Sequence, residues 1–361
     1  MDFGSVLKDL CSQTGVSGSE KELSVFISHL FEIFCDSVEI DPFFNVIGIK
    51  RGFGSSKKRI LVMAHADEIG FLVKSIDDRG FIRFTNIGGM DSKILLAQEV
   101  VIHGRERLPG IIGAKPPHLL KPEETKKAVK LDELAIDTGM DAVQVKKLIS
   151  IGDLITLKTV PLELQGGKFS SKALDNRSGV AVLLRTMENI CSVKHENDVY
   201  FIANTQEEVG SRGAIIASYN ALPDAAVVID ACHGDMPDAP KDEIFTLGKG
   251  PAVAIGPNLH RKMTNRLIET AKEGNIPYQT DVEPGDTGTD AWFTQVSRSG
   301  IPTVLISVPV RYMHTPVETV SLSDIKNAGR LVAEFVSLST EEWRGYFAAE
   351  KIDGPERGFR E

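Results

Sequence analysis

The first 35 residues of the chain carry apolar side chains at helical spacing. Val6, Leu7 and Leu10 fall on one face of a first predicted helix. A second predicted helix has its own apolar face, which is made of Leu23, Phe26, Ile27, Leu30, Phe31 and Phe34. Ser19 followed by Glu22 resembles a capping box and predicts the start of this second helix. Residues 46–49 and 59–64 are short, mostly apolar runs, which are typical of buried strands.

The pattern changes between residues 69 and 164, where short β-like runs alternate with turns rich in Gly and Asp. These runs are FLVKSI (71–76), FIRFTNI (81–87), EVVIHG (99–104) and DLITLKT (153–159). They predict a small β-rich domain. Its centre is interrupted by KPPH at 115–118 and by a charged stretch at 121–132, which we expect to be an exposed loop.

An α/β pattern returns after residue 165. The predicted strands at 199–203, 225–229 and 303–307 alternate with predicted helices at 178–190, 211–219, 264–273 and 323–338. This alternation favours a largely parallel sheet covered by helices. We therefore predict an α/β domain formed by residues 1–68 and 165–345, split by an inserted β domain at 69–164. Residues 346–361 are predicted to be a polar C-terminal tail.

Composition narrows the class of protein. Hydrophobic residues make up 42% and charged residues 25%, which is ordinary for globular proteins and excludes disordered, collagen-like and coiled-coil chains. The chain has 50 acidic residues against 41 Lys and Arg, a net charge of −9. We expect no nucleic-acid partner, because such binding relies on neutralising phosphates. No apolar run approaches the roughly 18 residues of a membrane helix, so we expect no membrane partner.

The cysteines indicate the cellular compartment. Cys11, Cys35, Cys191 and Cys232 are widely spaced and form no CxxC pair. The N-terminal segment MDFGSVLKDL has no basic stretch followed by a long apolar core, so we expect no secretory signal. The sequence therefore predicts reduced thiols in a cytoplasmic protein.

Candidate chemistry gathers where predicted strands end. His65 directly follows the strand at 59–64, and Asp67 comes two residues later, where a carboxylate can hold the second ring nitrogen of a metal-binding imidazole. Glu207 and Glu208 follow the strand at 199–203. Adjacent side chains point in different directions, so one glutamate can bind a metal ion while the other faces a substrate.

Three more candidates occupy comparable positions. Asp230 ends the strand at 225–229, His314 follows the strand at 303–307, and Asp175 opens a helix, where helix capping is the structural alternative. Together, the histidines and carboxylates supply the ligands of a two-metal site bridged by a carboxylate and a water molecule. Mixed nitrogen and oxygen donors suit zinc, cobalt or manganese.

The ordered set of motifs resembles a known family. AHADEIG (64–70), KPPH (115–118), ALDNRSG (173–179), QEEVGSRGA (206–214), Asp230 and RYMHTPVE (311–318) are similar to the tetrahedral or glutamyl aminopeptidase family of dinuclear metallopeptidases. Some members of that family are labelled cellulases or endoglucanases. The resemblance runs from about residue 3 to about residue 340. It implies a three-layer α/β sandwich around a mixed, mainly parallel sheet of the zinc-peptidase type, with an inserted, barrel-like β domain.

The resemblance also implies a ligand set. Two divalent ions, zinc or cobalt and otherwise manganese, would be held by His65, Asp175, Glu208, Asp230 and His314. Asp175 would bridge the ions, with His65 and Asp230 completing one site and Glu208 and His314 the other. Because relatives have a cis peptide after the bridging aspartate, we expect one between Asp175 and Asn176.

Catalytic and substrate-binding roles are implied in the same way. Glu207 would be the general base and acid, and Asp67 would orient His65. Asp290, Trp292 and Cys232 are expected to contact substrate. The chain departs from the family pattern at Cys232 and His233, in ACHGDMPD, and at Asp286 and Thr287, which precede GTDA. Both departures bear on the substrate pocket.

The implied activity is a metal-dependent aminopeptidase that acts on short peptides. The implied assembly is a homo-oligomer, in which dimers built through the inserted domain form a hollow tetrahedral dodecamer. The preferred N-terminal residue stays open, because an acidic preference would require a basic pocket and the sequence does not place Arg261, Lys262, Arg298 or Arg311.

Three alternatives remain at this point. A related two-metal N-acyl amidohydrolase or deacylase would share these ligands but act on blocked amines. A glycoside hydrolase would use Glu207 and Asp230 as paired carboxylates, which leaves the histidines without a role. A metal-stabilised assembly protein would associate without hydrolysing anything.

Overall fold

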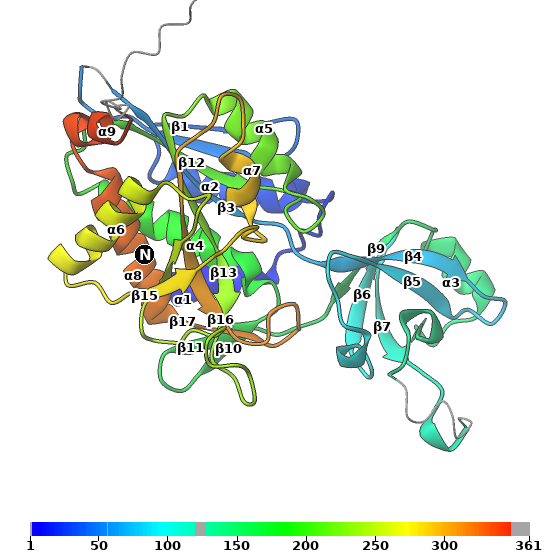
Figure 1. Cartoon of the computed structure of the whole chain (residues 1–361). Helices are drawn as coiled ribbons and strands as arrows, with labels where there is room; N and C mark the ends of the chain where they lie inside the picture. Colours follow the sequence, from blue (N-terminus) through cyan, green and yellow to red (C-terminus); the bar gives the residue numbers. More distant parts are fainter. Residues whose placement is uncertain (1, 56, 120–127, 348–361) are drawn as a thin grey trace, which may run out of the picture.

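A mixed sheet of eight strands forms the centre of the larger part of the molecule in the computed structural model, which describes residues 2–55, 57–119 and 128–347 (Figure 1). The strand order is β1-β2-β12-β3-β13-β16-β14-β15. Their bounds are Ser37–Ile40, Val46–Lys50, Asp198–Asn204, Arg59–His65, Ala225–His233, Thr303–Val310, Ala252–Ile255 and Gln279–Val282. The middle strands β12, β3, β13 and β16 are parallel, whereas β1, β2 and the β14–β16 pairing are antiparallel.

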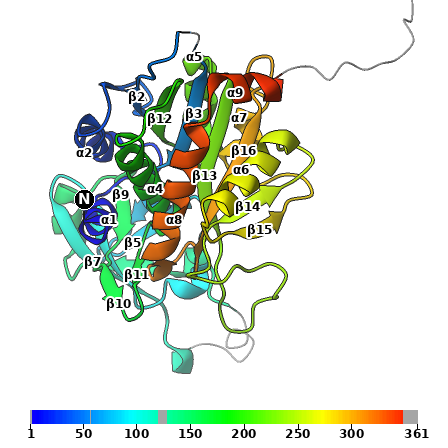
Figure 2. The same cartoon turned by 90° about the vertical axis from the view of Figure 1, so that its left-hand side faces the viewer.

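Alternate residues of the buried strands pack against helices on opposite faces of this sheet. Ile60 and Val62 belong to the apolar cluster beneath α4 (Leu174–Ile190) and α8 (Leu322–Val336), whereas Leu61 and Met63 belong to a separate cluster on the other face. Figure 2 shows α4 and α8 side by side along the sheet. The mixed, mainly parallel three-layer sandwich predicted from the sequence is therefore confirmed.

The remaining helices complete the two outer layers. The cluster beneath α4 and α8 also takes residues from α1, α2 and α6, and the opposite cluster takes residues from α5 and α7. The bounds of these helices are Phe3–Ser12, Lys21–Glu32, Arg261–Glu273, Arg212–Ala221 and Asp290–Thr294. A last helix, α9 (Thr340–Phe347), packs the buried side chain of Trp343 against Phe335.

A closed barrel lies to one side of the sandwich (Figure 1). It consists of β4 (Gly70–Ile76), β5 (Ile82–Ile87), β6 (Glu99–His103), β7 (Arg107–Gly113), β8 (Ala135–Asp137) and β9 (Leu154–Leu157). Its own apolar core contains Phe71 and Phe84, and α3 (Ala142–Leu148) covers one end. The chain enters the barrel from β3 and returns to the sandwich before α4, so the predicted barrel-like insertion is confirmed.

Short elements connect the two parts and fill the loops. A three-stranded sheet is made of β10 (Leu162–Leu164), β11 (Lys168–Ser171) and β17 (Glu318–Ser321). Single 3-10 turns cover Ser92–Ile94, Pro117–Leu119 and Leu131–Glu133. Of the charged stretch at 121–132, residues 121–127 lie outside the described residues, as do residues 348–361 of the predicted tail. None of the described helices combines the length and apolar character of a membrane span.

The predicted capping box at Ser19 and Glu22 is wrong. Helix α2 begins at Lys21, and Glu20 in the N-cap position makes no side-chain cap bond. The Glu20 carboxylate instead accepts hydrogen bonds from the backbone N–H groups of Gly18, at 2.8 Å, and Gln206, at 3.1 Å. The sequence pattern at Ser19 and Glu22 is local, whereas the contact between Glu20 and Gln206 joins distant parts of the chain. This contact is favoured because a buried backbone N–H without an acceptor is costly.

Candidate metal centre

The predicted site residues meet at one edge of the central sheet. His65 ends β3, Asp230 lies in β13, and Glu208 follows β12. His314 follows β16, and Asp175 lies at the start of α4. Because β12, β3, β13 and β16 are parallel, their carboxyl ends open at the same edge, where α/β sheets place their ligands.

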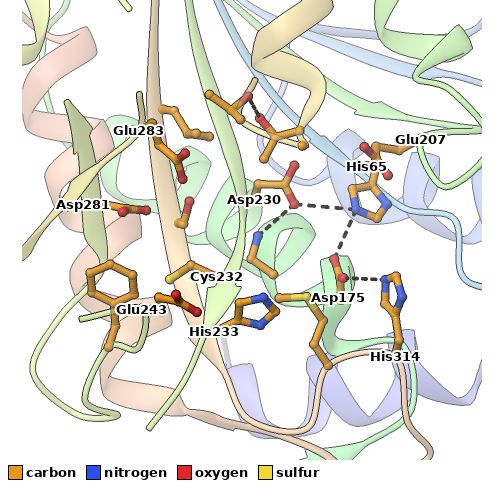
Figure 3. Close-up of a pocket in the computed structure, with 18 of the residues that line it drawn as sticks. His65, Asp175, Glu207, Asp230, Cys232, His233, Glu243, Asp281, Glu283 and His314 are labelled. Carbon is orange, nitrogen blue, oxygen red and sulfur yellow. Dashed lines mark hydrogen bonds and ion pairs between the residues drawn. The ribbon is translucent and has the colours of Figure 1, made fainter. Parts of the chain in front are cut away.

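Two groups of possible metal ligands share Asp175. One group is His65, Asp175 and Asp230, and the other is Asp175, Glu208 and His314; the ligand atoms of each group lie within 4.8 Å of one another. Asp175 Oδ1 lies 3.3 Å from His65 Nε2, and Asp175 Oδ2 lies 3.3 Å from His314 Nε2. Figure 3 shows the Asp175 carboxylate between the two imidazoles. Each oxygen of this carboxylate therefore faces a different group.

The second ligand of each group also lies close. His65 Nε2 is 3.7 Å from Asp230 Oδ1, and His314 Nε2 is 3.2 Å from Glu208 Oε1. Asp230 Oδ2 is buried and has no hydrogen-bond partner among the described residues. A buried carboxylate oxygen without a partner is costly unless a cation or donor satisfies it. This orphaned oxygen and the mixed nitrogen and oxygen donors fit a divalent metal ion.

The charges at the site also favour bound cations. Burial, followed by the neighbouring charges of Asp230, Asp290 and Glu208, raises the pKa of Glu207 to about 10. Burial and the charges of Asp175 and Asp290 raise the pKa of Asp230 well above its usual value. Hydrogen bonds to Asp175 and Glu208 outweigh the effect of burial and raise the pKa of His314 to about 11. Carboxylates crowded this closely repel one another, and divalent cations between them remove that repulsion.

Asp67 lies directly behind the proposed ligands. Its Oδ1 is 3.5 Å from His65 Nδ1 and also accepts the backbone N–H of Glu207 at 3.1 Å. Its Oδ2 accepts the Ser17 hydroxyl at 2.6 Å and the N–H of Glu208 at 3.3 Å. One buried carboxylate thus faces the imidazole and holds the loop that carries Glu207 and Glu208.

The start of α4 has the backbone that the resemblance implied. The peptide bond between Asp175 and Asn176 is cis, which confirms that prediction. Asn176 anchors this turn, since its side chain donates to Ile229 O at 2.9 Å and accepts the N–H of Gly179 at 3.0 Å.

Glu318 was missed by the sequence analysis. Its two oxygens accept the N–H of Asp175 at 3.0 Å and the N–H of His314 at 2.7 Å. Burial and the charge of Asp175 raise the pKa of Glu318 to about 8. Its position four residues after His314 was the available signal, but a contact with Asp175 across 143 positions needs the folded chain.

A buried ionic network behind the site was also missed. Glu68 pairs with Lys172 and, at 2.9 Å, with Arg177. The fully buried Arg177 also donates to Leu10 O at 2.7 Å and to Gln13 O at 2.6 Å. Arg177 therefore connects the end of α1 to the start of α4, next to the proposed metal ligand Asp175.

A cavity of about 520 Å³ opens beside the ligands and is lined by Glu207, Glu208 and Cys232, among others. Asp290 and Trp292 do not belong to its lining. Asp290 is buried, and its Oδ2 accepts the side-chain amide of Asn204 at 2.6 Å. Trp292 is half-buried in α7. The structure thus brings Cys232 to the cavity wall and leaves the other two expected substrate contacts outside it.

The three-layer fold and the two groups of possible ligands are typical of metal-dependent hydrolases of the α/β type. Residues 45–331 match the model of the M42 glutamyl aminopeptidase family. The chain belongs to this family. A putative aminopeptidase of Acetivibrio thermocellus is 37% identical over 341 residues, which cover 93% of this chain and 98% of the relative.

Two solved structures are also similar. An aminopeptidase from the archaeon Desulfurococcus kamchatkensis has a TM-score of 0.90 and 36% identity, over 97% of this chain and 98% of that chain. The Pyrococcus horikoshii TET1 peptidase, described as assembling into a tetrahedron or a large octahedral shell, has a TM-score of 0.79 and 30% identity, over 93% of this chain and 99% of that chain.

Family membership decides the class of activity. The predictions of this family and of a peptide-bond hydrolase that is a metal-dependent aminopeptidase are confirmed. The deacylase, the glycoside hydrolase and the non-catalytic assembly protein are not favoured.

Proposed function

We propose that the protein removes N-terminal amino acids from short peptides at a centre in which His65, Asp175, Glu208, Asp230 and His314 bind two divalent metal ions. The observation that carries this proposal is Asp175, whose two oxygens face the two histidines at 3.3 Å each. Zinc or cobalt is the proposed pair, with manganese as the other candidate, because all three accept mixed nitrogen and oxygen donors.

The side chains divide the chemical work. Two divalent ions bound here would polarise the scissile carbonyl and lower the pKa of water. Glu207 lines the cavity beside the ligands, and cations bound there would lower its raised pKa so that it is ionised. It is then proposed to take a proton from the attacking water and return it to the leaving amine. Asp67 holds the backbone N–H of Glu207 at 3.1 Å and faces His65 Nδ1, so it orients the base and one ligand together.

The substrate contacts proposed here include Cys232, which lines the cavity. Asp290 is proposed to stabilise the structure around the site instead, because it is buried and accepts a hydrogen bond from Asn204 at the end of β12. Trp292 is assigned no contact with the substrate, since it lies outside the cavity lining.

Residues 1–68 and 165–345 are proposed to form the catalytic domain, and residues 69–164 a domain through which protomers associate. Several apolar side chains of the inserted part are open to solvent, with exposed fractions of 57% for Ile111, 65% for Val143 and 73% for Ile151. Apolar surface of this kind is typical of association sites. A homo-oligomer of dimers, up to a tetrahedral dodecamer, is the proposed assembly. The cytoplasm is the proposed compartment, because all four cysteines lie in the described residues and are free thiols.

Glu207→Gln tests the central role. The variant keeps the size of the side chain and the backbone bond to Asp67, so we expect both metal ions to bind while turnover falls by about 10²- to 10⁴-fold. Metal content and hydrolysis of aminoacyl-anilides measure the two effects, and an N-acetylated substrate separates an aminopeptidase from a deacylase. The exposed Glu269→Gln on α6 is the charge-matched control. A metal-replete Glu207→Gln protein with near-normal activity would rule out the proposed role.

A further inference from the structure

The cavity beside the metal centre continues to a second, acidic wall. Asp281 and Glu283 line this wall, together with Asp242 and Glu243 from the loop after β13. In the view of Figure 3, Asp281 and Glu283 lie on the opposite side of the cavity from His65 and His314. The same cavity is lined by Asp230, whose buried Oδ2 has no partner among the described residues. The acidic wall is therefore part of a ligand-binding cavity and not an isolated surface cluster.

The pairing of β15 fixes the two central carboxylates. Asp281 is in register with Ala254 of β14, and the backbone N–H of Glu283 donates to Ile255 O at 2.9 Å. Residues two apart on a strand project from the same face. Asp281 and Glu283 therefore point together into the cavity, where both are half-buried.

The loop that carries Glu243 is tied to the end of β13. Phe245 N–H donates to His233 O at 2.8 Å, and Asp235 N–H donates to Phe245 O at 2.8 Å. Arg311 Nη2 lies 2.7 Å from Asp235 Oδ1 and ties the base of the loop to the end of β16. These bonds place Phe245 and Glu243 along the cavity.

No lysine or arginine is paired with the acidic wall in the cavity lining that the structure describes. Among the described residues that line the cavity, none is a lysine or an arginine. Arg311 is engaged by Asp235, and Arg298 stacks over the Tyr219 ring, with 3.9 Å from Cζ to the ring centre. Arg261 lines a separate pocket beside β14. The basic pocket that an acidic N-terminal residue would need is therefore not formed by these arginines.

Asp281 and Glu283 both have raised pKa values. Burial raises the pKa of Asp281. Burial and the negative charges of Asp281 and Asp286 raise the pKa of Glu283. The two side chains also share a hydrogen bond, which requires a proton on one of them. A cationic group placed between them would stabilise both carboxylates in their charged form.

The cavity lining also includes side chains that are apolar or weakly polar. Cys232 and Phe245 are two of them. Methylene groups pack favourably on such a surface while a charged end group reaches polar partners beyond it. The cavity volume of about 520 Å³ is within the usual range for small-molecule sites.

From this arrangement we infer that the enzyme selects peptides whose N-terminal residue is lysine or arginine. The methylene chain of that residue lies along Cys232 and Phe245, and its cationic end meets Asp281 and Glu283. The inference rests on the proposed function, because the same cavity holds the scissile bond at the metal centre.

Kinetics on the metal-loaded full chain tests the inference. Substrates are the anilides of lysine, arginine, leucine and glutamate. We expect kcat/KM for lysine and arginine to exceed that for leucine by about tenfold or more, and glutamate to be the poorest substrate. Asp281→Asn with Glu283→Gln is expected to lower the ratio of kcat/KM for lysine to that for leucine about tenfold, mainly through a higher KM for lysine. The exposed Glu269→Gln leaves the ratio unchanged.

Binding gives a readout that does not depend on turnover. Calorimetry compares L-lysine with L-norleucine, which has the same carbon chain without the ammonium group, and with L-glutamate. L-lysine is expected to bind at least about tenfold more tightly than norleucine, and the double variant to lose that difference. Equal binding of lysine and norleucine would overturn the inference whatever the activity.

The outcomes separate the two proposals. Cleavage that prefers leucine or glutamate overturns the basic specificity and leaves the aminopeptidase intact. Metal-loaded protein that cleaves no free-amine substrate overturns the proposed function, and the lysine–norleucine comparison then still decides what the acidic wall recognises.

Discussion

Two buried carboxylates hold the backbone around the proposed base. Asp67 accepts the N–H groups of Glu207 and Glu208, and Glu20 accepts the N–H of Gln206 at 3.1 Å. Gln206 has a φ of 57°, a left-handed conformation that costs energy for a residue other than glycine. At the scale of the residue, three consecutive N–H groups are fixed by side chains that come from distant parts of the chain.

Glu20 makes stability depend on pH. Burial raises its pKa from 4.5 to about 7 in the folded protein, so between these pH values the folded state binds more protons than the unfolded state. The contribution of the protonated Glu20 side chain to the free energy of unfolding therefore falls as the pH rises through this range. We expect the free energy of unfolding of Glu20→Gln, relative to the wild type, to increase by about 2 kcal/mol from pH 5 to pH 8.

Urea unfolding in the presence of a chelator measures this difference, because protonation of the proposed metal ligands is then common to both proteins. Glu39→Gln, at an exposed position in β1, is the control. A difference between Glu20→Gln and the wild type that does not change with pH would contradict the assignment.

The loop after β5 places part of the barrel next to the proposed metal centre. A Cβ atom added at Gly89 would lie 3.2 Å from His314 Nδ1, and one added at Gly88 would lie 3.3 Å from Glu208 Oε2. Gly88 also has a φ of 75°, which favours glycine. The inserted barrel therefore borders the group formed by Asp175, Glu208 and His314.

Gly89→Ala tests this contact. The added methyl group is expected to displace the half-exposed His314 ring by a few tenths of an ångström, weaken metal binding at its group and lower kcat/KM about tenfold. Metal titration and anilide hydrolysis measure both effects. Gly113→Ala on β7, where an added Cβ meets nothing within 4 Å, is the control. If Gly89→Ala binds metal with the same affinity as Gly113→Ala, the loop after β5 does not constrain His314.

At the scale of the whole molecule, the proposed metal centre joins elements that are far apart in the sequence. Its ligands come from the ends of β3 and β13, from the segments after β12 and β16, and from the start of α4. A ligand that binds only the folded state stabilises all of these elements together. Metal binding and global stability are therefore linked.

Thermal unfolding measures that linkage. Added zinc or cobalt at about 100 times its dissociation constant is expected to stabilise the fold by about 2.7 kcal/mol and raise the unfolding temperature by several degrees. The shift should be abolished by a chelator and largely lost in Asp175→Asn, which removes the shared carboxylate. An equal shift in Asp175→Asn would mean that the ions bind elsewhere.

Assembly is the second property of the whole molecule. If the inserted domain joins protomers, the triple variant Ile111→Asp, Val143→Asp and Ile151→Asp should reduce the mass in solution measured by light scattering, because charges at an apolar contact oppose association. Val193→Asp, an exposed apolar site in the sandwich, should not. An unchanged oligomer in the triple variant would place the contact on another surface.

Most of the elements and most of the candidate ligands could be predicted from the amino-acid sequence. Alternating and helical apolar patterns are local properties, so β3, β13 and α4 could be predicted, and His65 and Asp230 stand out because strand ends are readable in the chain. The ordered motifs, rather than spacing, indicated that Asp175 is shared between two groups. Weakly apolar elements at the sheet edges, such as β15, had too little pattern to be recognised.

The surroundings of those residues could not be predicted, because they depend on contacts between distant parts of the folded chain. Glu318 contacts Asp175 across 143 positions and Glu20 contacts Gln206 across 186, and such bonds depend on how strands are ordered in the sheet. Asp281 and Glu283 carry no motif, and they become a cavity wall because β15 lies beside β14 with these side chains on one face. Local pattern specifies which groups are present, whereas packing specifies which charges face one another and hence what the cavity can recognise.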